Sequence, residues 1–200
     1  VRRMTVEERV RVLVALTGDR DNRRQRPGRA LERPTYRFDI LSDYGAFRDL
    51  QRHRLMTIEW QRLTPLHGFS RPPDLDEAGV AGRFDEAMDR SAALHDVLAE
   101  PFPEQASYAV SLAYRIRYLM EMNAREAMHV IELRTTPQGH PAYRDVCQQM
   151  HHLIADVAGH RAIAEMIRFA DHSDEPELER IEAERRVEER RRARGDATVG

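Results

Sequence analysis

The sequence contains no lysine, so all 32 of its formal positive charges are arginines. Without a lysine amine, Schiff-base and pyridoxal-phosphate mechanisms are excluded. Arginine side chains are planar, permanently charged forks, which suit phosphates and planar heterocycles. The arginines are balanced by 34 acidic residues, giving a formal net charge of −2. A general attraction to nucleic acid or to an anionic membrane is therefore not expected.

Cysteine and long apolar runs are also scarce. Cys147 is the single cysteine, which excludes an internal disulfide and a cysteine-rich metal site. No apolar run approaches the roughly 18 residues that a membrane span needs. The first residues lack the apolar stretch of a secretory signal. We therefore expect a cytoplasmic protein without a membrane partner.

The remaining patterns are mostly helical. A capping box at Thr5 and Glu8 predicts a helix that ends at Gly18, and apolar–polar alternation over residues 36–40 predicts a half-buried strand. Further helices are expected over residues 44–55, 76–100, 104–122, 123–133, 141–158 and 160–170. These elements predict an α+β fold dominated by helices, with a small, mostly antiparallel sheet.

Two segments stand apart from this pattern by their charge. Residues 19–34 carry six arginines together with Pro27 and Gly28, which predicts a loop that is either mobile or ordered by an anion. Residues 175–194 are almost wholly charged, which is typical of a solvated helix or a frayed tail. We therefore expect one domain over 1–172 and a charged tail over 173–200.

The first candidate site is the run Arg52-His53-Arg54. It is either a basic cluster at a helix end, paired with Asp49 and Glu59, or a clamp for an anion. In the second case the two arginines would fork onto a phosphate while the histidine contacts a ring.

The second candidate site runs from Asn123-Ala124-Arg125 through His129 to Glu132-Leu133-Arg134. Arg125, His129 and Glu132 share one helix face, which also fits a solvated ladder of charges. Arg134 lies half a helical rotation from Arg125. The two arginines can reach one ligand only if the helix has ended or another protomer supplies part of the site.

In order and rough spacing, these two blocks resemble the flavin-dependent thymidylate synthases, over about residues 33–170. The resemblance implies a fold like that of the thymidylate synthase complementing proteins. It also implies a homotetramer with active sites between its subunits. It also implies that the ligands are FAD, deoxyuridine monophosphate (dUMP), methylenetetrahydrofolate and NADPH.

The resemblance further implies roles for individual residues. Arg134 would be the catalytic residue, because it would contact the uracil ring and favour negative charge on the N3 nitrogen of that ring. The cofactor-binding residues for FAD would be Arg52, His53, Arg54, Asn123, Ala124, Arg125 and His129.

Some residues depart from the family pattern, mainly where the substrate loop is expected. Arg62 stands in place of a serine, Trp60 in place of a glutamate, and Thr64-Pro65 in place of an arginine–tyrosine pair. Ser107 stands where a second substrate arginine is expected. These departures suggest a divergent relative, which binds flavin with another substrate or serves as a non-catalytic structural or regulatory subunit. As a non-catalytic subunit, the chain would pair with a sister copy.

Other candidates are weaker. His152, Asp156 and His160 have a spacing that metal ligands can use, but a surface position explains it better, and no metal is expected. Cys147 is interpreted as a small buried hydrophobe and Trp60 as a packing anchor. An arginine-rich nucleic-acid module, based on residues 20–33, is opposed by the net charge.

Overall fold

The computed structural model describes residues 3–173, 182, 185, 188 and 189, so the tail expected over 173–200 lies almost entirely outside the described residues. The chain forms two compact units. One contains residues 35–123, and the other combines residues 1–34 with 124–200. The expected fold class is confirmed, because helices dominate and the strands form one small antiparallel sheet.

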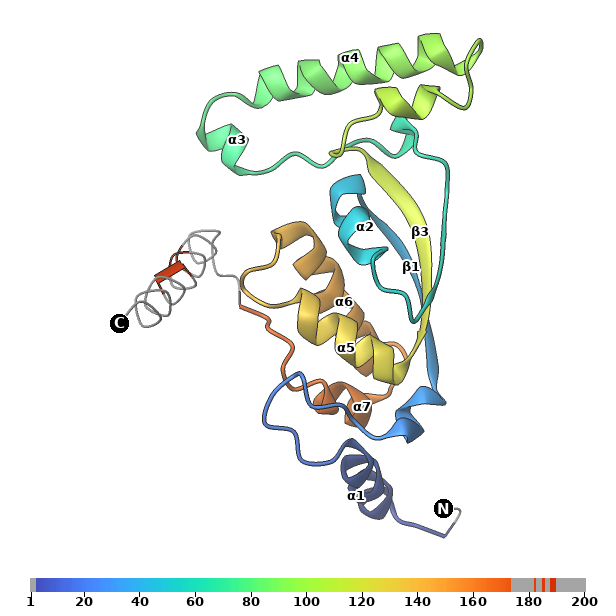
Figure 1. Cartoon of the computed structure of the whole chain (residues 1–200), viewed down its shortest axis with the longest axis vertical. Helices are drawn as coiled ribbons and strands as arrows, with labels where there is room; N and C mark the ends of the chain where they lie inside the picture. The colour runs from blue at the N-terminus through green and yellow to red at the C-terminus, as the bar shows by residue number, and fades with distance from the viewer. Residues whose placement is uncertain (1–2, 174–181, 183–184, 186–187, 190–200) are drawn as a thin grey trace, which may run out of the picture. The chain divides into compact units, whose positions relative to one another are not determined.

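The unit of residues 35–123 is built on a three-stranded sheet of β1 (Thr35–Asp43), β2 (Thr57–Trp60) and β3 (Arg115–Asn123). The strand order is β1-β3-β2, and both pairings are antiparallel. Figure 1 shows β1 and β3 side by side. Exposed and buried residues alternate along β1, which confirms the strand predicted around residues 36–40. The sheet therefore has one buried and one charged face.

The helix predicted over residues 104–122 is wrong. Residues 106–109 form a short 3-10 helix, η3 (Ala106–Ala109), and β3 occupies the centre of the sheet. Ile116, Tyr118 and Met120 are all buried on one face of this strand, whereas Arg117 points to the exposed face and pairs with Asp39 on β1. The period of two is what a central antiparallel strand requires.

The helix predicted over residues 44–55 is shorter in the structure. In α2 (Tyr44–Leu50) the Asp43 side chain caps the first turn by accepting a hydrogen bond from the Ala46 nitrogen at 2.8 Å. The buried stripe ends at Leu50, and the chain then turns toward β2. Arg52-His53-Arg54 therefore lies in this connection, not on the helix.

The helix predicted over residues 76–100 is divided into α3 (Asp74–Glu77) and α4 (Ala81–Ala99). Gly79 separates them with a φ of 67°, a conformation that interrupts a right-handed helix. Met88 of α4 forms a buried cluster with Val110 and Tyr114. A short 3-10 helix, η2 (Pro65–His67), lies between β2 and α3.

The second unit contains α1 (Val6–Thr17), the 3-10 helix η1 (Arg29–Glu32), α5 (Ala124–Arg134), α6 (Pro141–Asp156) and α7 (Arg161–Met166). α5 packs beside α6, and α7 contacts both α6 and α1 (Figure 1). The capping box at Thr5 and Glu8 is present as predicted. The predicted helix over 160–170 is shorter, ending at Met166.

A buried ion pair orders part of the 19–34 segment and corrects one further expectation. Arg20 belongs to the segment predicted as a mobile or anion-ordered loop, and its guanidinium forks onto the carboxylate of Glu132 on α5 with N–O distances of 2.9 and 2.5 Å. The two side chains are 2% and 1% exposed. Glu132 is thus no part of a solvated ladder, because its carboxylate is used to hold the 19–34 segment against α5.

Among the described residues, no helix is both long enough and apolar enough to cross a membrane.

Candidate functional site

Arg52-His53-Arg54 lies in the connection between α2 and β2, and both arginines are exposed. The backbone nitrogen of His53 donates to the Leu50 oxygen at 3.2 Å, which closes the turn after the helix. Arg52 lies 3.5 Å from the Asp49 carboxylate, as one of the two interpretations predicted, and its side chain is 67% exposed. A pair this exposed is worth little, so the guanidinium is available to a stronger anion.

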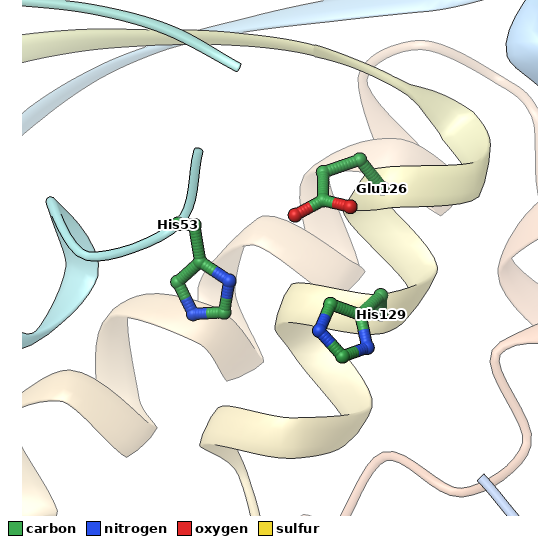
Figure 2. A group of neighbouring side chains, drawn as sticks. All are labelled: His53, Glu126 and His129. Carbon is green, nitrogen blue, oxygen red and sulfur yellow. The ribbon is translucent and has the colours of Figure 1, made fainter. Parts of the chain in front are cut away.

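The second block begins where β3 ends. Asn123 is the last residue of β3 and Ala124 the first of α5. Ala124 is fully buried, and its nitrogen donates to the Pro34 oxygen at 2.8 Å. Glu126 and His129 follow one turn apart on α5; Figure 2 labels both, together with His53 from the connection after α2. Glu126 is buried and His129 is exposed.

Arg125 is held by the N-terminal segment. Its Nε donates to the Pro27 oxygen at 3.1 Å, and one terminal nitrogen lies 2.8 Å from Glu32 Oε1. The side chain is 26% exposed. The Arg125–His129–Glu132 ladder proposed from the sequence is therefore wrong, since Arg125 and Glu132 each pair with a residue of the 19–34 segment.

Arg134 closes α5 on the opposite side from Arg125. Because the helix continues to Arg134, the half-rotation between the two arginines is retained. The Arg134 guanidinium lies 5.3 Å from the centre of the Tyr143 ring on α6. Burial raises the pKa of the neighbouring Cys147 to about 12, and the charge of Arg134 opposes this shift. Cys147 is fully buried, which confirms its interpretation as a small hydrophobe.

The residues that depart from the family pattern have structural partners. Arg62 forms an ion pair with Glu104 at 2.6 Å, and the Thr64 hydroxyl accepts a hydrogen bond from the Leu66 nitrogen at 3.4 Å. Trp60 packs against Phe47 with ring centres 5.6 Å apart. Trp60 is nevertheless 56% exposed, so it anchors the packing only in part.

The histidines that come together differ from those predicted. α6 ends at Asp156, which leaves His160 outside the helical face proposed for His152 and Asp156. Instead, His151 Nδ1 lies 2.8 Å from His172 Nε2, and the ring centres of His152 and His172 are 4.8 Å apart. No sequence spacing indicated this group, because His172 reaches it through the segment after α7.

Sequence reasoning also missed Glu32 and Glu126. Glu126 directly follows the Asn-Ala-Arg motif and precedes His129 by three residues, a spacing that places both on one helix face. Glu32 gave no such signal, since its partner Arg125 lies far along the chain.

Comparisons with known proteins agree with this architecture. A family model described as thymidylate synthase complementing protein matches residues 20–159. A UPF0159 protein of Chlamydia muridarum is 38% identical over 185 residues, which is 92% of this chain and 34% of that protein. The UPF0159 protein Ta1429 of Thermoplasma acidophilum is 37% identical over 186 residues, 92% of this chain and 37% of the relative. The chain thus spans about a third of the length of these relatives.

Among solved structures, the UMP/dUMP methylase PolB from Streptomyces cacaoi, bound with 5-Br dUMP, superposes with a TM-score of 0.63. The match covers 84% of each chain at 18% sequence identity, so it establishes a shared fold. The family model covers most of the chain, including Arg52-His53-Arg54 and all of α5. The chain belongs to the thymidylate synthase complementing protein family.

Proposed function

We propose that this chain binds FAD and takes part in the reductive methylation of dUMP to thymidylate, with methylenetetrahydrofolate and NADPH as co-substrates. The observation that carries the proposal is the family match over residues 20–159, which contains both arginine-rich blocks. The similarity in fold to a protein described as a UMP/dUMP methylase supports a pyrimidine nucleotide as the substrate.

The residues present fit an anionic dinucleotide cofactor. Arg52 and Arg54 are exposed forks whose donors suit the oxygens of a diphosphate. Ala124 is buried at the start of α5, and Arg125 and His129 lie within the next turns of the same helix. Asn123 offers an amide at the end of β3. When bound, FAD supplies the hydride chemistry that the protein itself lacks.

Arg134 is assigned to the nucleotide. Activation of a uracil ring builds negative charge, and a guanidinium fixed over Tyr143 stabilises such charge without reorganising. Arg134 would thus polarise the ring at N3 while leaving the cofactor contacts to Arg125 and His129.

The second candidate is a non-catalytic subunit that pairs with an active copy. It is favoured by Arg62, whose guanidinium is paired with Glu104, and by Trp60 and Thr64, which pack or cap locally. These residues use the expected substrate loop for internal contacts. On this alternative the chain retains FAD but does not form thymidylate.

Titration of the purified protein with FAD tests the proposal first. We expect a yellow protein, and loss of flavin retention in the Arg52→Ala/Arg54→Ala double variant with an unchanged far-UV circular dichroism spectrum. Arg48→Ala, an exposed arginine on α2, is the matched control and should retain flavin. Equal flavin content in the parent and the double variant would rule out Arg52 and Arg54 as ligands of the FAD diphosphate.

Titration with dUMP and an assay for thymidylate separate the two candidates. Arg134→Ala should keep FAD but weaken dUMP binding by about tenfold or more, as expected for a lost charged hydrogen bond. Arg161→Ala, an exposed arginine on α7, is the control. Flavin binding without thymidylate formation would favour the non-catalytic subunit.

A further inference from the structure

The guanidinium of Arg125 is fixed on two sides by the segment that precedes β1. The Pro27 oxygen accepts from Nε at 3.1 Å and Glu32 Oε1 lies 2.8 Å from a terminal nitrogen. Because the donors of an arginine lie in one plane, two acceptors at different edges define the orientation of the whole group. The direction in which Arg125 presents its remaining donors is thus set by a segment distant in sequence.

The acceptors themselves are held in place. The nitrogen of Gly28, which follows Pro27, donates to the Leu16 oxygen at 2.8 Å. A Cβ added at Gly28 would lie 2.2 Å from that same oxygen, so only glycine allows this approach. Leu31, next to Glu32 in η1, is 2% exposed. The turn and η1 therefore form a rigid support, and η1 packs against α5.

Glu32 is shared by two arginines of different exposure. Arg29, three residues earlier, lies 3.1 Å from Oε2 through a terminal nitrogen and 3.2 Å from Oε1 through Nε, with its side chain 83% exposed. Arg125 lies 2.8 Å from Oε1 with its side chain 26% exposed. Solvent screens the Arg29 pair strongly and the Arg125 pair much less. Arg29 contacts both oxygens of Glu32 at the surface, whereas the contact with Arg125 is the less exposed of the two and links η1 to α5.

We propose that Glu32 is a positioning residue, which orients the Arg125 guanidinium for the cofactor at the start of α5. This inference rests on the proposed FAD site, and it assigns the affinity of that site partly to a carboxylate that does not touch the ligand. A guanidinium already ordered before binding loses less entropy when the cofactor arrives. Removing Glu32 should therefore weaken FAD although an anionic group is removed from the neighbourhood of an anionic ligand.

The test compares FAD dissociation constants, measured by quenching of FAD fluorescence, in five variants of the full chain. Glu32→Ala should raise the constant about tenfold, and Arg125→Ala at least as much. Glu32→Gln keeps an acceptor oxygen and should recover part of the loss. Arg29→Ala should match the parent. The double variant Glu32→Ala/Arg125→Ala should bind as Arg125→Ala does, because the two residues act through one group.

Tighter FAD binding in Glu32→Ala would overturn the proposal, since it would make Glu32 a competitor of the ligand. Additive losses in the double variant would also overturn it, since Glu32 would then act without Arg125.

A measurement without ligand separates this inference from the proposed function. In the ligand-free parent, the Arg125 Nε–H should give a nuclear magnetic resonance signal that exchanges slowly with water, and in Glu32→Ala exchange should be at least about tenfold faster. Equal exchange rates would show that Glu32 does not order Arg125. A parent that shows slow exchange but binds no FAD would overturn the proposed cofactor site and leave the orientation of Arg125 established.

Discussion

Arg20 and Glu132 carry opposite charges that are both removed from water, at 2% and 1% side-chain exposure. Burial of either charge alone is costly, so the two groups depend on each other and on the further acceptor at Gln25, whose oxygen lies 2.7 Å from Arg20 Nε. The Arg20 guanidinium also lies 5.2 Å from the centre of the Phe169 ring. The pair ties α5 to the 19–34 segment that contributes Pro27 and Glu32.

Glu132→Ala should lower the free energy of unfolding by about 3–5 kcal/mol, because it leaves a buried guanidinium without its counter-charge. Urea denaturation followed by circular dichroism measures this. Glu86→Ala is the control, since Glu86 and Arg90 form a pair on α4 with side chains 63% and 78% exposed. It should change stability by less than about 0.5 kcal/mol. A similar small effect of both variants would contradict the role assigned to Glu132.

The Cys147 thiol should be unreactive in the folded protein. Burial raises its pKa to about 12, so very little thiolate is present at pH 8, and the side chain has no exposed surface. A colorimetric thiol reagent at pH 8 should label one thiol per chain in guanidinium chloride and almost none in buffer. Rapid labelling of the folded protein would mean that α6 opens easily around this residue.

At the level of elements, the sequence indicated those whose signals are local. The capping box at Thr5 and Glu8 placed one helix start, and alternation over residues 36–40 placed β1. β3 was mistaken for a helix because its apolar residues are joined by Leu119 on the other face, which blurs the period of two. A short apolar stretch of this kind is compatible with a helix or a strand, and the pairing with β1 and β2 decides between them.

Substitutions on the two faces of β3 should therefore have unequal effects. Met120 has no exposed surface, and Met120→Ala should cost about 2–5 kcal/mol in unfolding free energy. Leu119, its neighbour on the other face, is partly exposed, and Leu119→Ala should cost clearly less. Urea titration of both variants checks this. Equal costs would be inconsistent with a strand that buries one face.

The contact between α6 and the segment after α7 should depend on pH. His151 Nε2 lies 2.9 Å from the Ala164 oxygen, which can only accept, so Nδ1 of His151 accepts from His172 Nε2–H. Partial burial lowers the pKa of His172, the charges of His151 and His152 lower it further, and Asp171 opposes them. The folded protein therefore favours neutral His172.

The sign of the pH effect follows from this lowered pKa. The stabilisation of the folded protein by neutral His172 is complete above the ordinary histidine pKa of about 6.5. It is lost as the pH falls below that value, because the unfolded chain then binds more protons than the folded chain. Between pH 7.5 and 5.5 the urea midpoint should fall in the parent and fall less in His172→Gln. Identical pH profiles for the two proteins would rule out a contribution from His172.

For the whole molecule, the sequence motifs identified the candidate residues but not their surroundings. Arg52-His53-Arg54 and the α5 block were visible as patterns, yet the partners of Arg125 became visible only once the chain had folded, because Pro27 and Glu32 lie about a hundred positions earlier. The side chains of one helix that face a ligand can be inferred from their spacing in the sequence. The groups that orient those side chains are distant in sequence and are known only from the tertiary structure.

The opposite directions of Arg125 and Arg134 on α5 make a final prediction about assembly. Arg125 is directed to Pro27 and Glu32, whereas Arg134 lies over Tyr143, so one copy of the helix does not present both to one ligand.

If each proposed site takes Arg125 from one subunit and Arg134 from another, Arg125→Ala and Arg134→Ala should each be inactive in thymidylate formation. Refolded together in equal amounts, they should regain activity in about one site in four, the share that receives both arginines by random mixing. The Arg125→Ala/Arg134→Ala double variant mixed with Arg134→Ala is the control and should stay inactive, because no site in it can receive Arg134. Failure of the two single variants to complement each other, when the parent is active after the same treatment, would place both arginines in the site of one chain.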